Sequence, residues 1–365
     1  MVIRSLELTD YRNYPSLQIE FDEGTNILYG ENAQGKTNIL EAIYLCATTK
    51  THKGSKDSEV IRFGASEGHI RSYVYGDGVT TKIDMHLRSG KSKVIAIDEK
   101  RIKKASDLLG LCKVVFFSPE DLNIIKSGPN YRRKFVDMEL SQLDSFYLYN
   151  LINYHKIVDQ RNKLLKDLAF QPHLVETLSI WDDQLVGYGK KLIERRRQFA
   201  TQMGEILGPI HEKLSGGKEH LSAVYEPDTT EEDFAEQLLH ARERDKKNKT
   251  TSVGPHKDDF SFLIGDVDVR RFGSQGQQRT AALSLKLAEI ELMKKLSDSD
   301  DPPILLLDDV LSELDGNRQR FLLESIGEIQ TFITCTGLED FVNDRFEMNR
   351  VFEVHAGSVT QKSNL

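Results

Sequence analysis

Cysteine is scarce in this chain, with three residues in 365, and none belongs to a Cys-x-x-Cys pair. Cys46, Cys112 and Cys335 are odd in number and far apart. This argues against a disulfide-stapled scaffold and against a zinc-binding cysteine cluster. We expect reduced thiols that pack as small hydrophobic side chains, in a cytoplasmic protein.

Long apolar runs are also missing. No stretch approaches the roughly 20 apolar residues that a membrane-spanning helix needs. Residues 1–8 alternate between apolar and polar types, as a strand does, and lack the basic and apolar regions of a signal peptide. We therefore expect a protein without a membrane partner.

An excess of positive charge is missing as well, because the net charge is −8. This opposes indiscriminate binding to nucleic acid. Four clusters of basic residues nevertheless leave room for a local positive surface, and two of the four lie within 100–104 and 242–249. The two clusters that rank first as DNA contacts are Arg132, Arg133 and Lys134, and Lys190, Lys191, Arg195, Arg196 and Arg197.

What the chain does contain is a complete phosphate-binding loop at residues 30–37, Gly-Glu-Asn-Ala-Gln-Gly-Lys-Thr. A strand-like run at 25–29 precedes it, and a helical pattern at 38–45 follows it. Its glycines let the backbone N–H groups surround a polyphosphate; Lys36 would neutralise the β and γ phosphates, and the Thr37 hydroxyl would ligate Mg²⁺. The predicted ATP-binding residues here are Gly30, Glu31, Asn32, Ala33, Gln34, Gly35, Lys36, Thr37 and Asn38.

A second element of a nucleotide site lies at residues 303–309, where four aliphatic residues lead into two aspartates. Such a run is typical of a fully buried parallel strand. Two acids at its end would be costly without a cation. We expect Asp308 to hold the metal and Asp309 to polarise the attacking water, with Lys36 as the other catalytic residue.

A helix start at residues 274–280 has the features of an anion-binding site. Ser274 is a natural N-cap for a helix at 280–295, and Gly276 permits a phosphate to approach closely. By itself this pattern favours an ordinary capped helix. Its place about 30 residues before the two aspartates favours a nucleotide contact.

The rest of the chain indicates an α/β fold. Strand patterns dominate the first 120 residues, and a helical period runs from about 130 to 214. Strand character returns at 221–225 and at 260–264. Residues 360–365 are expected to form a frayed tail.

Taken together, the motifs resemble the ABC-type ATPase heads of the chromosome-maintenance and recombination branch. Within this branch the chain is most similar to the RecF family of bacterial recombination mediators. The segments that carry the resemblance are 8–14, 30–42, 117–122, 254–259, 274–279 and 308–315. The resemblance implies a discontinuous ATPase head at 1–120 and 250–365, with a mixed sheet and an antiparallel β subdomain, and a helical insert at 121–249.

The resemblance also implies roles for particular residues. Ser274, Gln275, Gly276 and Gln277 match the signature that contacts the γ-phosphate held by another copy, so that two ATP molecules lie in a head-to-tail dimer. Ser312 and Asp315 match the loop that crosses this dimer interface. Arg12 stands where related heads place a residue near the nucleotide.

Three positions depart from the common pattern of such heads. Asp309 replaces the usual catalytic glutamate and is one methylene shorter. The usual switch histidine is missing near 334–336, where Thr336 is the expected occupant. The usual metal-sensing glutamine is also missing, with Ser118 and Glu120 nearby. These departures indicate a slow timer and not a fast motor.

The resemblance implies that the chain is a weak, DNA-stimulated ATPase with ATP and Mg²⁺ as cofactors. ATP would drive dimerisation on gapped or single-strand/double-strand DNA, largely independent of base sequence. A RecR-type mediator and a recombinase would be its partners in DNA repair, the SOS response and replication restart.

Three alternatives remain open from the sequence. A chromosome-structuring ATPase head would carry long coiled-coil arms, for which the helical insert is short and interrupted. A P-loop kinase or NTPase acting on a small molecule would not need the helix start at Ser274. A scaffold that binds ATP without hydrolysing it would not respond to the loss of Asp309.

Overall fold

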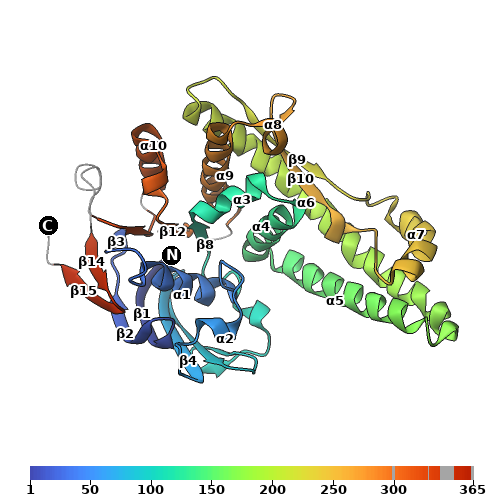
Figure 1. Ribbon diagram of the computed structural model, residues 1–365, viewed down its shortest axis with the longest axis horizontal. Helices are drawn as coiled ribbons and strands as arrows, with labels where there is room; N and C mark the ends of the chain where they lie inside the picture. Colours follow the sequence, from blue (N-terminus) through green and yellow to red (C-terminus); the bar gives the residue numbers. More distant parts are fainter. Residues whose placement is uncertain (298–300, 328, 338–348, 363–365) are drawn as a thin grey trace. The chain divides into compact units, whose positions relative to one another are not determined.

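The computed structural model describes residues 1–297, 301–327, 329–337 and 349–362 (Figure 1). The chain divides into two compact units. Unit 1 comprises Met1–Asp121 and Glu289–Leu365, and unit 2 comprises Leu122–Ala288. The two units are described separately below.

Unit 1 contains a six-stranded antiparallel sheet. Its strands are β1 (Val2–Tyr11), β2 (Tyr14–Glu20), β4 (Glu67–Gly76), β5 (Val79–Arg88), β6 (Val94–Ile97) and β7 (Lys100–Arg101), in the order β2-β1-β4-β5-β6-β7. Apolar residues such as Leu6 and Leu8 alternate with polar ones, and are buried on one face. This is the period-2 pattern of a sheet with one face on a core and one in solvent.

A second six-stranded sheet in unit 1 is mainly parallel. Its order is β15-β14-β3-β13-β12-β8, with strands β3 (Thr25–Tyr29), β8 (Val114–Phe117), β12 (Ile304–Asp308), β13 (Thr331–Cys335), β14 (Arg350–His355) and β15 (Ser358–Lys362). Only the pairing of β15 with β14 is antiparallel. All five residues of β12 are buried, as its aliphatic run predicts. The carboxyl ends of β3, β13 and β12 therefore lie side by side at one edge.

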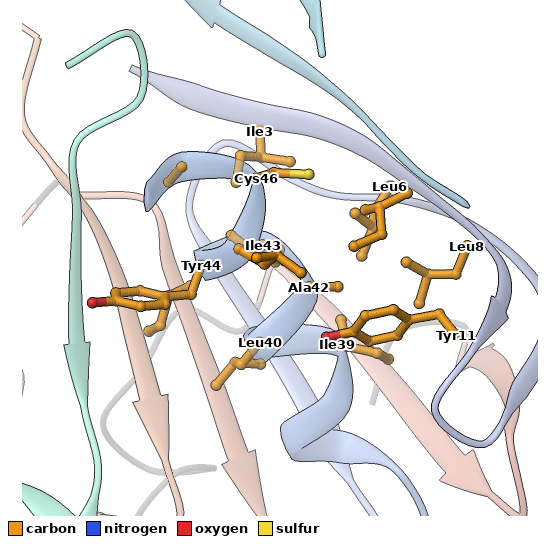
Figure 2. Close-up of a cluster of buried hydrophobic side chains, with 14 of the residues drawn as sticks. Ile3, Leu6, Leu8, Tyr11, Ile39, Leu40, Ala42, Ile43, Tyr44 and Cys46 are labelled. Carbon is orange, nitrogen blue, oxygen red and sulfur yellow. The ribbon is translucent and has the colours of Figure 1, made fainter. Parts of the chain in front are cut away.

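Helix α1 (Lys36–Thr48) contacts strands of both sheets of unit 1. Figure 2 shows its apolar side chains, including Ile39 and Ile43, packed against Leu6 and Leu8 of β1. Because α1 contacts both sheets, nearly all its residues are buried. This packing fixes the helix whose first residues, Lys36 and Thr37, complete the phosphate loop. The unit also holds α2 (Asp57–Val60), α10 (Gly316–Ile326) and the 3-10 turns at Ala105–Asp107, Pro119–Asp121 and Leu311–Glu313.

Unit 2 is mostly helical, as the 3.6-residue period predicts. Its helices are α3 (Leu122–Lys126), α4 (Pro129–Leu143), α5 (Ser145–Asp167), α6 (Leu178–Leu214), α7 (Phe234–Asn248) and α8 (Val269–Phe272), with 3-10 turns at Pro172–Thr177 and Pro255–Lys257. A three-stranded antiparallel sheet joins β9 (Leu221–Glu226), β10 (Asp259–Ile264) and β11 (Val267–Asp268). The unit boundary falls within α9 (Gln275–Leu296).

Two expected boundaries differ from those in the structure. Residues 250–288, expected in the head, belong to unit 2, because β10 pairs along its whole length with β9. Residues 360–362, expected in a frayed tail, belong to β15 and pair with β14. The remaining tail residues, 363–365, lie outside the described part of the chain.

No helix within the described ranges has both the length and the apolar character that crossing a membrane would require.

Candidate nucleotide site

The phosphate loop joins β3 to α1 at the carboxyl edge of the mainly parallel sheet. Gly30 and Gly35 have φ angles of 150° and 116°, which residues other than glycine rarely adopt. A Cβ atom at Gly35 would lie 2.5 Å from the Asn13 amide nitrogen and 2.7 Å from the Tyr14 hydroxyl. Both glycines are therefore required by the turn and by close packing behind it.

Residues of the β1–β2 turn hold the loop from behind. The Asn13 amide donates to the Gln34 carbonyl at 2.8 Å, and the Asn38 amide donates to Asn13 Oδ1 at 2.8 Å. The Tyr14 hydroxyl donates to the Gly35 carbonyl at 3.0 Å. These bonds fix the shape of the loop before any ligand arrives. No local sequence signal marks Asn13 and Tyr14 as supports of the loop, although both fall in a segment that carries the family resemblance.

Lys36 is held inside the loop. Its Nζ donates to the carbonyls of Gly30 at 2.5 Å and Glu31 at 2.8 Å. Burial lowers the pKa of Lys36, while the nearby carboxylates of Asp309 and Asp308 act to raise it. The ammonium is thus kept where a phosphate surrounded by the loop would meet it.

Asp308 is the centre of a small oxygen cluster. The hydroxyls of Thr37 and Thr334 donate to Asp308 Oδ1 at 2.8 and 2.9 Å. Burial raises the pKa of Asp308, and the two hydroxyl donors partly offset this effect. Carboxylate and hydroxyl oxygens are the ligands that Mg²⁺ prefers, so this donor set fits the expected ion.

A pocket of about 130 Å³ opens in front of these groups. It is lined by residues 32–38 of the loop together with Asp309 and Thr334. Asp309 has a φ of 56°, and its backbone N–H donates to Thr334 Oγ1 at 2.9 Å. The strained backbone and this bond together keep Asp309 at the pocket.

Thr334, and not Thr336, is the threonine of β13 that reaches the pocket. Thr334 pairs with Asp308 across the parallel strands, whereas Thr336 follows the strand and is exposed. Our expectation for Thr336 is therefore corrected. The strand end at Cys335 decides between the two positions, and the sequence does not reveal that end.

An ion pair near Asp308 involves Glu120, one of the two residues expected near the metal-sensing position. Glu120 Oε1 lies 2.9 Å from Lys53 Nζ. The hydrogen bond to Glu120 raises the pKa of Lys53, and the Asp308 charge adds to this effect. Ser118 is buried, and its backbone N–H donates to Asp121 at 2.7 Å. Glu120 is thus the more accessible of the two residues expected near the metal-sensing position.

Arg12 is not brought to the pocket. Its guanidinium donates to Glu41 Oε2 at 2.9 Å and to the Glu59 carbonyl at 3.1 Å. Glu41 belongs to α1 and is buried, so the ion pair ties the β1–β2 turn to that helix. In this structure the position of Arg12 supports the loop indirectly.

The Ser274 segment lies in unit 2 at the start of α9. Ser274 N–H donates to Gln277 Oε1 at 2.8 Å, and Gln277 N–H donates to Ser274 Oγ at 3.2 Å, which is a reciprocal capping box. Gln277 also donates to Glu219 Oε1 at 2.8 Å. Ser274, Gln275 and Gly276 are exposed, and a Cβ at Gly276 would meet only Ser274 Oγ, at 3.9 Å. The protomer itself therefore does not require glycine at position 276.

Ser312 and Asp315 lie just after the Asp309 segment and are exposed. The Ser312 hydroxyl donates to the Asp309 carbonyl at 2.9 Å. Asp315 caps α10 by accepting from the N–H groups of Asn317 and Arg318 at 3.2 and 3.0 Å. These bonds couple an exposed loop to the pocket-lining aspartate.

Two of the basic residues predicted to contact DNA are buried in ion pairs, which corrects that prediction. Arg132 donates to both carboxylate oxygens of Asp259, at 2.7 and 3.0 Å, and is 2% exposed. Arg196 bonds Asp137 and Asp258 at 2.7 and 2.8 Å and is 1% exposed. Both guanidinium groups are thus buried in unit 2 with carboxylate partners and are not available to DNA.

The other residues of these clusters are at least partly accessible. Lys134, Lys191 and Arg197 are exposed, and Arg133, Lys190 and Arg195 are intermediate. Arg133 donates to the Asp258 carbonyl at 2.5 Å, whereas Arg195 and Arg197 pair with Asp144 and Glu231. Lys134, Lys190 and Lys191 are thus the more suitable of these residues for contacts with phosphate.

The fold and the pocket define an ABC-type ATPase head, with a phosphate loop and an aliphatic strand ending in two aspartates at one sheet edge. Residues 2–360 match the model of the RecF/RecN/SMC N terminal domain family. The chain belongs to this family and, within it, to the RecF proteins.

Relatives at high identity support the second part of this assignment. "DNA replication and repair protein RecF" of Lachnospira eligens is 56% identical over 365 residues and covers all of both chains. The protein of the same name from Lachnoclostridium phytofermentans is 57% identical over 359 residues, covering 98% of this chain and 99% of its own.

Solved structures support the same family assignment. One described as "the recombination mediator protein RecF-ATP in RecFOR pathway" has a TM-score of 0.92 at 34% identity and covers 99% of this chain and 97% of its own. An SmcHead bound to the C-winged helix domain of ScpA has a TM-score of 0.59 at 17% identity, covering 100% and 98%, and shares the fold. The predicted fold class and family are confirmed.

Proposed function

We propose that this chain is an ATP-dependent, DNA-binding recombination mediator that acts in DNA repair. The observation that carries the proposal is the cluster in which Thr37, Thr334 and Asp308 converge next to Lys36. It provides oxygen ligands for Mg²⁺ and a cation for phosphate within one pocket. Relatives named for DNA replication and repair, and a related structure described as RecF-ATP, support the biological setting.

Two copies would associate head to tail around two ATP molecules. The exposed capping box at Ser274 would meet the γ-phosphate held by the phosphate loop of the other copy. An anion at a helix start gains from the free N–H groups and from the helix dipole, and charge-assisted bonds are about twice as strong as neutral ones. Space above Gly276 supports this role, because among the described residues only Ser274 Oγ, at 3.9 Å, would come near a Cβ atom there.

Hydrolysis would end the association. Asp309 would polarise the attacking water, and the loss of the γ-phosphate would remove the bonds from Ser274 at both sites. The hydroxyl of Thr334 stands where a faster ATPase head would place a switch histidine, which fits a slow, DNA-stimulated timer. Ser312 and Asp315 would sense the other copy and transmit its presence to Asp309 through the bond at 2.9 Å.

DNA would be held through its backbone, with gapped or single-strand/double-strand junctions as substrates. Lys134, Lys190 and Lys191 are the proposed contacts, since phosphate contacts position a protein without reading sequence. A RecR-type mediator and a recombinase are the proposed protein partners, in the cytoplasm. Repair, the SOS response and replication restart are the proposed processes.

The decisive experiment titrates gapped, blunt and single-stranded DNA with and without ATP, at two salt concentrations. The proposal expects ATP to tighten binding, and gapped or junction DNA to bind best. Light scattering under the same conditions should show dimers only with ATP and Mg²⁺. A chain that stays monomeric at saturating ATP, Mg²⁺ and DNA would overturn the proposal.

A further inference from the structure

A cluster of three potential metal ligands lies on the antiparallel sheet of unit 1, outside the nucleotide pocket. His69 of β4 and His86 of β5 are paired directly across the two strands. Glu67 precedes His69 by two residues, so its side chain is on the same face of β4. The neighbouring residues Ile70 and Met85 are buried on the opposite face. The cluster therefore lies on the solvent face of the sheet.

The three side chains converge. The imidazole rings of His69 and His86 are stacked, with centroids 4.1 Å apart and an interplanar angle of 15°. His86 Nε2 lies 2.8 Å from Glu67 Oε2. One ligand atom from each of the three residues lies within 4.8 Å of the other two. To bring all three ligand atoms to about 2.1 Å from one ion, the side chains would have to rotate so that the two rings leave their stacked arrangement.

The donor set has the chemistry of a transition-metal site. Two imidazoles and a carboxylate leave at least one coordination position open, as in catalytic zinc sites, whereas Mg²⁺ prefers oxygen ligands alone. Metal binding requires neutral imidazole.

Two cationic residues lie near the cluster: Arg71 of β4, and Arg88 of β5, which is paired directly across from Glu67 and donates to the Ser92 carbonyl at 3.1 Å. Arg71 is the nearest cationic residue along β4, and it is paired with Glu7 at 2.9 Å and Asp84 at 2.6 Å. Its positive charge is therefore balanced by two carboxylates. The carboxylate of Glu67 remains 54% exposed and can turn towards an ion.

We propose that Glu67, His69 and His86 form a binding site for one divalent transition metal of the zinc class. The ion would link β4 to β5 at the end of the hairpin opposite its turn, and water would occupy the open coordination position. This proposal is independent of the proposed ATP-dependent function, because none of the three residues lines the nucleotide pocket.

The test uses the full chain, stripped of metal with a chelator, near neutral pH and in millimolar Mg²⁺ to occupy the Asp308 site. Zn²⁺ alone is titrated by calorimetry, and Co²⁺ is titrated by visible absorption, which reports its coordination number. We expect one Zn²⁺ per chain, a four- or five-coordinate Co²⁺ spectrum and a higher thermal midpoint with Zn²⁺.

His69→Gln and His86→Gln should each weaken Zn²⁺ binding by about tenfold or more, in line with the cost of disturbing a metal site. Glu67→Gln should weaken it less, since one of three ligands loses only its charge. His240→Gln, at an exposed histidine of α7, is the matched control and should bind as the parent does. The proposal is overturned if the parent takes up no Zn²⁺, or if both histidine variants bind it unchanged, which would mean that the cluster is only an exposed ion pair.

Discussion

Thr37 and Asp308 are 271 residues apart in the sequence, yet the Thr37 hydroxyl donates a hydrogen bond of 2.8 Å to Asp308 Oδ1. The bond joins the first turn of α1 to the end of β12. It exists because β3 and β12 flank β13 in one parallel sheet, so that their carboxyl ends share an edge. Two expected Mg²⁺ ligands are thereby placed in contact.

The first prediction concerns the cation of the phosphate loop. Lys36→Ala should abolish ATP binding and, with it, dimer formation, because the charge that neutralises the β and γ phosphates is lost. Filter binding measures the first effect and light scattering the second. Lys50→Ala, at an exposed lysine just beyond the other end of α1, should change neither. Dimers of Lys36→Ala that form without nucleotide would contradict the prediction.

The second prediction distinguishes the residues that bind ATP within one copy from Ser274, which is proposed to contact the ATP held by the other copy. Ser274→Arg should leave ATP binding to single copies intact but block ATP-dependent dimerisation, because a long side chain would occupy the space meant for the other copy. Ser145→Arg is the matched control, since it is also an exposed serine at a helix start in unit 2. If Ser274→Arg loses affinity for ATP as a monomer, the assignment of this segment to the other copy's nucleotide is wrong.

The third prediction concerns the proposed catalytic acid. Asp309→Asn should slow ATP hydrolysis by about a hundredfold or more and prolong the life of the dimer, because an amide cannot act as a base. Asparagine tolerates the positive φ of 56° at this position, so the fold should be kept. Asp309→Glu retains a carboxylate and should retain hydrolysis. Phosphate release and dimer decay should be measured together. In a passive scaffold that does not hydrolyse ATP, Asp309→Asn would change neither of them.

The fourth prediction follows from the raised pKa of Asp308. The folded chain holds this proton more tightly than the unfolded chain does, so the group makes folding less favourable as the pH rises from the ordinary aspartate pKa through the raised value. The full cost is present above that raised pKa. Asp308→Asn keeps an acceptor for Thr37 and Thr334 but carries no charge.

Asp308→Asn should therefore raise the thermal midpoint of the nucleotide-free protein at neutral pH, and the gain should shrink as the pH falls towards about 4. The same variant should lose the added stability that ATP and Mg²⁺ give the parent. Thermal unfolding across this pH range, with and without ATP and Mg²⁺, is the measurement. A lower midpoint at neutral pH without nucleotide would show that burial does not dominate the energetics of this carboxylate.

Short-range patterns explain what could be predicted from the sequence. The phosphate loop needs glycine at fixed spacing, and the buried parallel strand β12 needs an uninterrupted aliphatic run, so both are visible within ten residues. The capping box at Ser274 is equally local, and its two reciprocal bonds are present. Alternating residues likewise indicated β1, β4 and β5.

Long-range pairing explains what could not be predicted. Arg132 belongs to a basic run, and only the fold shows that its partner, Asp259, lies 127 residues away. Arg12 was predicted to contact the nucleotide, and only the fold shows that it also forms an ion pair with Glu41. A charged residue in a cluster has no sequence signal that separates a buried ion pair from a solvent-exposed group.

The last prediction uses this distinction to test DNA binding. Affinity for DNA should fall steeply as salt increases, because contacts with the backbone release counterions. Lys134→Ala and Lys191→Ala, at exposed residues, should each weaken binding and reduce the slope of log affinity against log salt by about one, without changing the fold. Arg132→Ala should instead destabilise unit 2 by about 3–5 kcal/mol, because it leaves Asp259 without its buried partner. Fluorescence anisotropy at several salt concentrations and urea unfolding make the comparison. A flat salt response, or a lysine variant that binds as the parent does with the same slope, would remove these lysines from the DNA surface.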